Sequence, residues 1–293
     1  MRPTRLLTSL ASAVLLLLAA LLVSPAPQAQ AIQTGADLPA RWAPAAKAKI
    51  HPGVQMFTKG AQCTGNFVFK DRVGRVYVGY AAHCAGKGAA TDTNGCNTRS
   101  HPIGTRVRFA DDATLATNGT TVGGGTLVYS SWIKMHRRHT QNRAACEAND
   151  FALVRVDRND RRKVNPSVPF WGGPTGLSVA GAPAGSRVYS WGHSSLRPGT
   201  ALSPKTGSSL GRTYRGWGWE VYTATPGIPG DSGSGFLDAR GRALGTLSTV
   251  QLAPLAGANG LGDLEHELRY AQSFSGIGGL HLVRGTRKFS PVP

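Results

Sequence analysis

Three short motifs carry side chains that could together perform nucleophilic acyl transfer. The segment 230–235, Gly-Asp-Ser-Gly-Ser-Gly, places Ser232 among glycines. His83 stands in Ala-Ala-His-Cys after a strand-like segment, and Asp150 directly precedes the apolar run 151–154. Acyl transfer to a hydroxyl needs a base, a carboxylate that orients the base, and N–H donors where the oxyanion forms. Ser232 is the candidate nucleophile, His83 the base and Asp150 the orienting carboxylate, with the N–H groups of Gly230 and Ser232 as donors.

Each motif taken alone also has an ordinary structural interpretation. The glycine-rich segment could be a plain turn, and both a histidine at a strand end and an aspartate before a strand are common without any catalytic role. The order of the three along the chain is more informative. It runs His, Asp, Ser, whereas α/β-hydrolases run Ser, Asp, His and subtilisins run Asp, His, Ser. The order therefore excludes both of those classes.

The chain resembles the chymotrypsin-like serine proteases, and most of all their bacterial secreted members. The resemblance covers residues 50–271. It rests on Cys-Thr-Gly-Asn-Phe-Val at 63–68 before Ala-Ala-His-Cys at 81–84, on Ser-Trp-Gly at 190–192, and on Gly-Thr-Leu-Ser at 245–248. It implies an all-β fold of two packed six-stranded antiparallel β-barrels with a short C-terminal helix. It also implies a serine endopeptidase that needs no cofactor or metal.

Two departures from the family pattern concern the nucleophile loop. Ser234 replaces the glycine usual two residues after the nucleophile, a change of one small residue for another. The disulfide that commonly flanks this loop is missing, because no cysteine follows Cys146. We expect the loop to keep its turn while the walls of the substrate pocket are less constrained.

The elements that must position these residues are mostly strands. Short β-branched and aromatic segments recur between Gly, Pro and Asn/Asp punctuation, which is typical of an all-β protein. One helix is expected after Asp263, where Leu264, Leu268 and Ala271 share a face. The polar and Gly/Pro-rich passage 161–184 indicates a linker between an N-terminal barrel at 50–160 and a C-terminal barrel with helix and tail at 185–293. The predicted strands are 66–69, 75–80, 105–109, 126–129, 151–156, 186–191, 218–223, 235–238 and 243–250.

Four cysteines in an exported chain indicate two disulfides, for which three pairings exist. The resemblance favours Cys63 with Cys84, around the candidate base, which leaves Cys96 with Cys146. A zinc site is not expected, because no two cysteines have knuckle spacing.

The first residues have the pattern of a signal peptide. Arg2 and Arg5 precede an apolar run of about 18 residues, and Ala-Gln-Ala at 29–31 is a cleavage signal. We expect residues 1–31 to be removed, the mature protein to be secreted to the extracellular space, and no membrane span to remain. Residues 32–49 are a candidate pro-segment that ends before Ile50. In many relatives a new N-terminal amine pairs with the aspartate before the nucleophile, here Asp231, but Ile-His-Pro-Gly at 50–53 departs from their usual sequence, so insertion is not expected.

The chain is strongly basic. Its formal charge is +18, and removal of Arg2 and Arg5 leaves +16. The surplus cations are scattered, and no groove-reading motif accompanies them, so a nucleic-acid partner is not predicted. A solvated cationic surface that adsorbs to anionic polymers is the preferred interpretation.

The resemblance also suggests which residues contact substrate. Pro226 falls at the floor of the primary pocket, six residues before Ser232, with Ile228 and Val250 as walls and Ser248 on the strand that holds the extended substrate. An apolar floor without a carboxylate disfavours cleavage after Arg or Lys. The expected partners are polypeptides cut after apolar residues. Two alternatives stay open, a protease-fold binding protein without turnover and an esterase with the same triad.

Overall fold

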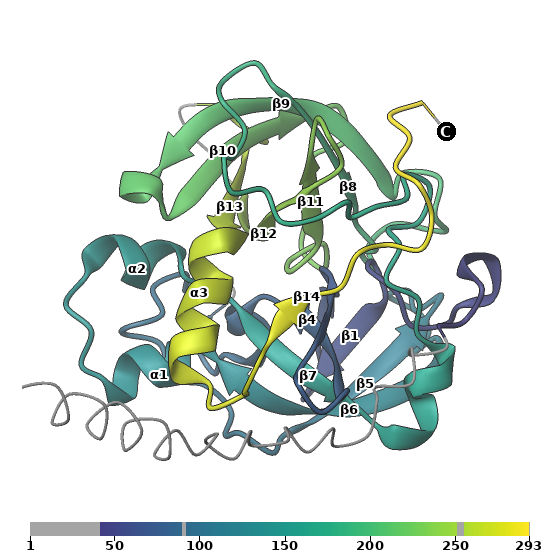
Figure 1. The fold of residues 1–293 in the computed structure, drawn as a ribbon, viewed down its shortest axis with the longest axis horizontal. Helices are drawn as coiled ribbons and strands as arrows, with labels where there is room; N and C mark the ends of the chain where they lie inside the picture. The colour runs from purple at the N-terminus through teal and green to yellow at the C-terminus, as the bar shows by residue number, and fades with distance from the viewer. Residues whose placement is uncertain (1–41, 90–91, 251–254, 293) are drawn as a thin grey trace, which may run out of the picture. The chain divides into compact units, whose positions relative to one another are not determined.

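The computed structural model describes residues 42–89, 92–250 and 255–292. The expected signal peptide at 1–31 lies outside these residues. The chain is built mostly of antiparallel strands, in two systems (Figure 1). Among the described residues, no helix has the length and apolar character needed to cross a membrane.

The N-terminal half forms one eight-stranded sheet with the order β14-β3-β4-β7-β6-β5-β1-β2. One of its edge strands comes from the far end of the chain, because β14 pairs with β3 after the last helix. The strands are β1 (Gln55–Thr58), β2 (Ala61–Thr64), β3 (Val68–Lys70), β4 (Val76–Tyr80), β5 (Arg106–Asp111), β6 (Thr120–Ser130), β7 (Ala152–Val156) and β14 (His281–Leu282).

The C-terminal half forms a closed six-stranded barrel with the order β10-β13-β12-β11-β8-β9. The all-β prediction is thus confirmed. In the hairpin turn between β11 and β12, Gly241 has a positive φ of 72°. The barrel strands are β8 (Arg187–Trp191), β9 (Pro204–Thr213), β10 (Gly218–Thr223), β11 (Gly235–Asp238), β12 (Ala243–Val250) and β13 (Asn259–Asp263).

The central strand β4 is buried on both faces, and its neighbour β7 is buried except at Arg155. Val76, Val78 and Tyr80 alternate into the core of the N-terminal sheet, while Tyr77 faces a second core. This second core also contains residues of the C-terminal half, such as Leu237. Since successive side chains of a strand point to opposite faces, β4 is held by apolar packing from both sides. The strand ends that carry the candidate catalytic residues are therefore anchored in rigid structure.

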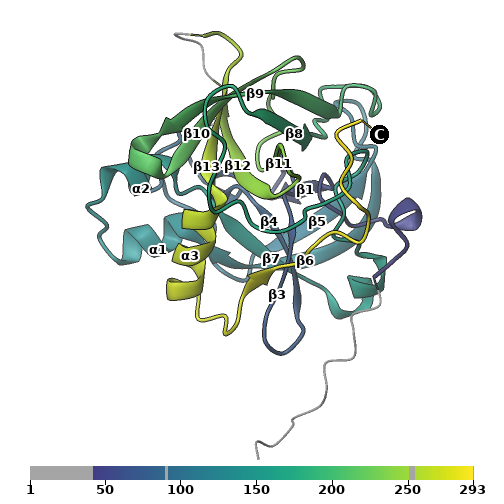
Figure 2. The same ribbon diagram turned by 45° about the horizontal axis from the view of Figure 1, so that its top comes forward.

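The expected terminal helix is α3 (Leu264–Phe274), capped by the Asp263 side chain, which accepts a hydrogen bond from the His266 N–H at 3.0 Å. Its predicted apolar face is buried. Two short helices that the sequence did not predict, α1 (Ser131–Arg137) and α2 (Arg143–Ala148), precede Asp150. Figure 2 shows α3 beside α1, at the point where the chain leaves the closed barrel. Among the described residues there are also four short 3-10 helices: η1 (Ala45–Lys47), η2 (Ala82–Ala85), η3 (Arg158–Lys163) and η4 (Tyr214–Gly216).

Candidate active site

Strand pairing brings His83 and Asp150 together. In the antiparallel pair of β4 and β7, Tyr80 lies opposite Ala152. His83 follows Tyr80 in η2, and Asp150 precedes Ala152, so both residues lie at the same end of these two paired strands. The Nδ1 atom of His83 lies 2.6 Å from Oδ2 of Asp150. Two residues 67 apart in the sequence thus form a hydrogen-bonded pair.

The Asp150 carboxylate is buried and accepts three hydrogen bonds. Oδ1 accepts the backbone N–H of His83 at 2.8 Å, and Oδ2 accepts the Ser248 hydroxyl at 2.6 Å in addition to the His83 ring. Burial by itself would raise the pKa of Asp150, but the charge of His83 and these hydrogen bonds bring it below its ordinary value. Burial would likewise lower the pKa of His83, but the charge and hydrogen bond of Asp150 raise it above 6.5. The lowered pKa of Asp150 means that its carboxylate stays ionised beside His83, and the raised pKa of His83 means that its ring binds a proton more readily.

Ser232 lies on a loop that contacts both halves of the site. Its carbonyl accepts the Thr64 N–H at 2.8 Å, and the next residue, Gly233, donates to the Leu247 carbonyl at 2.7 Å. A Cβ at Gly233 would lie 2.9 Å from the Ala81 nitrogen, so only glycine allows the loop to approach the chain that leads to His83. Within the described residues the Ser232 hydroxyl makes no hydrogen bond, and the side chain is partly exposed.

The candidate oxyanion donors, the N–H groups of Gly230 and Ser232, are available to bind an oxyanion. Gly230 has φ +94°, a conformation that favours glycine. Among the hydrogen bonds of the described residues, neither the Gly230 N–H nor the Ser232 N–H has a protein acceptor, whereas the intervening Asp231 N–H donates to Ile228 at 2.9 Å. Two uncommitted N–H groups on one tight turn are what binding of an oxyanion requires.

Sequence reasoning missed the two cations that pair with Asp231. Nη1 of Arg197 lies 2.5 Å and Nζ of Lys205 lies 3.1 Å from Oδ2 of this fully buried carboxylate. Burial lowers the pKa of Lys205, opposed by the charge of Asp231 and reinforced by that of Arg197. Ile50 is elsewhere: it is buried, and its N–H donates to the Lys163 carbonyl at 3.1 Å. No motif marks Arg197 or Lys205 among the 33 cations of the sequence.

Both disulfides join the cysteines in sequential order. Cys63–Cys84 connects β2 to the η2 turn that carries His83, and Cys96–Cys146 fixes α2 before Asp150. The sulfurs of Cys63 and Cys84 lie near the His83 ring, but as a disulfide they cannot serve as thiolate ligands.

The predicted substrate-contacting residues lie at three places around the loop. Pro226 and Ile228 are partly buried on the segment before Gly230. Ser248 bonds Asp150, as described above, while Val250 is exposed at the end of β12. Residues 251–254, which follow Val250, lie outside the described part of the chain.

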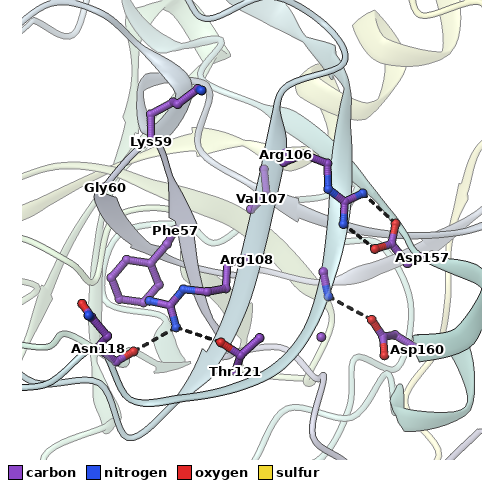
Figure 3. Close-up of a pocket in the computed structure, with 12 residues that line it drawn as sticks. Phe57, Lys59, Gly60, Arg106, Val107, Arg108, Asn118, Thr121, Asp157 and Asp160 are labelled. Atoms are coloured by element: carbon purple, nitrogen blue, oxygen red, sulfur yellow. Dashed lines mark hydrogen bonds and ion pairs between the residues drawn. The ribbon is translucent and has the colours of Figure 1, made fainter.

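A separate pocket of about 660 Å³ lies on the outer face of β1, β5 and β6, away from these residues (Figure 3). Its cations do not converge. Arg106 forms two hydrogen bonds to Asp157, Arg108 stacks on Phe57, and the Lys59 side chain points away from both. This pocket contains no candidate catalytic residue.

Comparisons with known proteins place the chain among peptidases. A family model described as a trypsin-like peptidase domain matches residues 63–245, which include all three candidate catalytic residues. No curated protein matches the chain.

Several solved structures are similar. Protease A of Thermobifida fusca is 17% identical, with a TM-score of 0.49, over 80% of this chain and 99% of that one. The Nocardiopsis protease is 19% identical, with a TM-score of 0.45, over 80% and 98%. The chymotrypsin of Cellulomonas bogoriensis is 17% identical, with a TM-score of 0.44, over 80% and 98%. Because these scores are below 0.5, the fold assignment rests on the strand topology and the family match.

Proposed function

Because the chain belongs to the trypsin-like peptidase domain family, we propose that it is a secreted serine endopeptidase that hydrolyses peptide bonds through an acyl-enzyme on Ser232. The observation that carries the proposal is the hydrogen bond between His83 and the buried Asp150, beside a loop that presents Ser232 and two uncommitted N–H groups. The two disulfides support an oxidising compartment, in line with export by the segment 1–31.

The proposed reaction has two halves, formation of the acyl-enzyme on Ser232 and its hydrolysis by water, and the same groups act in both. With Nδ1–H donated to Asp150, the neutral His83 ring has its lone pair on Nε2 and takes the proton of Ser232 as Oγ attacks the scissile carbonyl carbon. The oxyanion is bound by the N–H groups of Gly230 and Ser232. The C–N bond then breaks, and His83 gives its proton to the leaving amine. Water, deprotonated by His83, attacks the acyl-enzyme, and the acid product leaves with Ser232 reprotonated.

Labelling with a fluorophosphonate probe, followed by peptide mapping, tests the nucleophile. We expect one modified residue, Ser232, and loss of both labelling and several orders of magnitude in kcat in Ser232→Ala, because triad members act as a unit. Ser195→Ala is the matched control, since Ser195 lies on a neighbouring loop and contributes its backbone N–H to the contacts seen. Labelling that persists in Ser232→Ala, or that maps to Ser194 or Ser195, contradicts the assignment.

Comparison of casein with a small activated ester separates the remaining functional classes. An endopeptidase cleaves both, an esterase cleaves the ester alone, and a protein without turnover cleaves neither.

We also propose that cleavage follows apolar residues. Two cations lie behind the predicted pocket floor: Nη2 of Arg197 donates to the Pro226 carbonyl at 2.6 Å, and Nζ of Lys205 lies 3.4 Å from the same oxygen. A substrate Arg or Lys would therefore meet positive charge and no described carboxylate on that loop besides the already paired Asp231. Profiling with a peptide library should give aliphatic and aromatic residues before the cut, with modest discrimination among them. Dominant cleavage after Arg or Lys contradicts this proposal.

A further inference from the structure

We infer that Gln62 and Thr64, on strand β2 of the N-terminal sheet, are positioning residues that fix the peptide between the two oxyanion donors. The inference rests on the proposed function, because it assigns the oxyanion hole to the N–H groups of Gly230 and Ser232. The acceptor that both side chains share is the carbonyl oxygen of Gly230. The Thr64 hydroxyl donates to it at 2.7 Å, and Nε2 of Gln62 donates to it at 3.0 Å.

Strand geometry explains why two side chains reach one oxygen. Residues two apart in a strand point to the same face, so Gln62 and Thr64 project together toward the C-terminal half. Cys63, between them, points the other way and is bonded to Cys84. The disulfide therefore holds the strand, and the strand aims both polar groups at the nucleophile loop.

The same two side chains also bind the loop 193–195. The His193 N–H donates to the Thr64 hydroxyl at 3.2 Å, and the Ser195 N–H donates to Oε1 of Gln62 at 3.0 Å. These contacts indicate which atoms donate. Because Thr64 accepts from His193, its own proton is directed to Gly230. Because the Gln62 oxygen accepts from Ser195, its amide nitrogen faces the carbonyls of Gly230, His193 and Cys63.

The peptide that Gln62 and Thr64 hold lies between the two candidate oxyanion donors. The Gly230 carbonyl belongs to the peptide that joins Gly230 to Asp231, between the peptides that carry the two donor N–H groups. Gly230 has φ +94° and no side chain, so rotation of this peptide has little steric opposition of its own. Asp231 is held through its carboxylate by Arg197 and Lys205. Its N–H, on the amide side of the same peptide, donates to the Ile228 carbonyl at 2.9 Å. Gln62 and Thr64 hold the carbonyl side, so both sides of the peptide are fixed between the two flanking N–H groups.

Loss of either contact should affect the transition state more than the bound substrate. Charge develops on the oxyanion in the transition state, so a misdirected N–H lowers kcat while KM changes little. Residues that orient metal ligands without touching the metal contribute about 10- to 100-fold to activity, and we expect a comparable effect for residues that orient oxyanion donors. We expect Thr64→Val, which keeps the shape but removes the hydroxyl, to lose kcat in this range, and Thr64→Ser to recover most of it.

Thr58→Val is the matched control. Thr58 lies on β1 of the same hairpin, is as buried as Thr64, and hydrogen-bonds through its hydroxyl to Tyr80 at 3.1 Å. It should lose stability to a similar degree and keep kcat within about twofold of wild type, as expected of a site without catalytic contact. Gln62→Ala provides a second variant at a partly exposed position if Thr64→Val folds poorly.

The experiment measures kcat and KM on a peptide substrate, inhibition by a peptide aldehyde that forms a tetrahedral adduct, and thermal unfolding. The inference predicts reduced kcat and weaker aldehyde inhibition in Thr64→Val and Gln62→Ala, with near-normal KM. It is overturned if both variants keep wild-type kcat, or if Thr58→Val loses kcat as strongly as Thr64→Val. A wild-type enzyme without Ser232-dependent turnover would instead refute the proposed function, and the inference with it.

Discussion

At the scale of single residues, the pair of His83 and Asp150 sets the pH range in which the proposed enzyme works. The base must be neutral to accept the Ser232 proton, so activity is lost as pH falls through the pKa of His83. Burial acts to lower that pKa, but Asp150 raises it above 6.5. We therefore expect the acid limb of kcat/KM to lie above 6.5 in the wild type. Initial rates measured from about pH 4 to pH 9 at constant ionic strength give the position of this acid limb.

Asp150→Asn and Asp157→Asn test the cause of that shift. The first should lower kcat by several orders of magnitude and move the acid limb downward, because the raising charge is lost while burial remains. The second removes a carboxylate that pairs with Arg106 far from the site and should leave the profile unchanged. A profile that is flat down to pH 4 would argue against His83 as the base.

The candidate triad residues lie in local sequence patterns, whereas the residues that contact them do not. His83 and Asp150 are predicted from the segments around them, and the structure brings their side chains into hydrogen-bond contact. Thr64 and Gly230 meet across 166 positions of the chain, and nothing adjacent to Thr64 signals that contact. Residues of this kind become visible only when the strand that carries them has been placed against its partner.

At the scale of elements, the strands with strong apolar alternation were the predictable ones. Val76–Tyr80 and Ala152–Val156 were anticipated almost to the residue. Strand β9 (Pro204–Thr213) was missed because it is rich in Gly and Ser, and pairing with β8 and β10 makes it a strand despite low propensity. Helices α1 and α2 are too short to show a helical period, and tertiary packing stabilises them.

Helix α3 carries one residue that its apolar pattern does not explain. Glu267 is fully buried on the same face as Leu264 and Leu268. Oε1 accepts the Asp150 N–H at 3.2 Å, and Oε2 accepts the Thr246 hydroxyl at 2.7 Å. Burial raises the pKa of Glu267 well above its usual value, and the charge of Asp150 raises it further, against the lowering effect of its hydrogen bonds. The folded protein thus favours a neutral carboxyl beside Asp150, the candidate orienting carboxylate.

A neutral Glu267 predicts a specific pH dependence of stability. Because its pKa is raised on folding, its stabilising contribution is complete below the unfolded value near 4.5 and is lost as pH rises through the folded value. Glu267→Gln, which cannot ionise, should unfold in urea much like wild type at low pH. It should become more stable than wild type above that pH, by ~1 kcal/mol per pH unit until the folded pKa is passed.

The control is Glu265→Gln on the same helix, where the carboxylate pairs with the exposed Arg269. It should change stability by less than about 1 kcal/mol, without this widening. A difference between Glu267→Gln and wild type that stays constant from pH 5 to pH 8 would mean that Glu267 is ionised in the folded protein.

At the scale of the whole molecule, the segment before Ile50 is bound to the body of the protein. The Ala43 N–H donates to the Val164 carbonyl at 2.9 Å, and the Asn165 side chain donates to the Ala43 carbonyl at 2.7 Å. Asp231 already has internal cations as partners. We therefore predict that a chain beginning at Ile32 is as active as one that begins at Ile50. Sequencing of the mature N-terminus and assays of both forms decide this.

The variant Arg197→Ala tests whether the internal cation paired with Asp231 is needed for activity. If Arg197 pairs with Asp231 in place of an inserted N-terminal amine, this variant should lose activity by the same factor in the chain that begins at Ile32 and in the chain that begins at Ile50. Activity that appears only after cleavage at Ile50, or rescue of Arg197→Ala by that cleavage, would mean that the new amine reaches Asp231.

The surplus positive charge of the whole molecule predicts adsorption to anionic polymers. The cations around the pocket in Figure 3 diverge, Arg106 is paired with Asp157, and Arg108 stacks on Phe57. The charge therefore acts as a diffuse field and not as one anion site. Adsorption to anionic polymer beads should be strong at ~0.01 M salt, where fields extend ~30 Å, and weak at ~1 M, where they extend ~3 Å. Under the diffuse view, Arg108→Gln lowers retention only slightly, about as much as Arg240→Gln on the β11–β12 turn. If Arg108→Gln alone abolished retention, the pocket would be a discrete binding site.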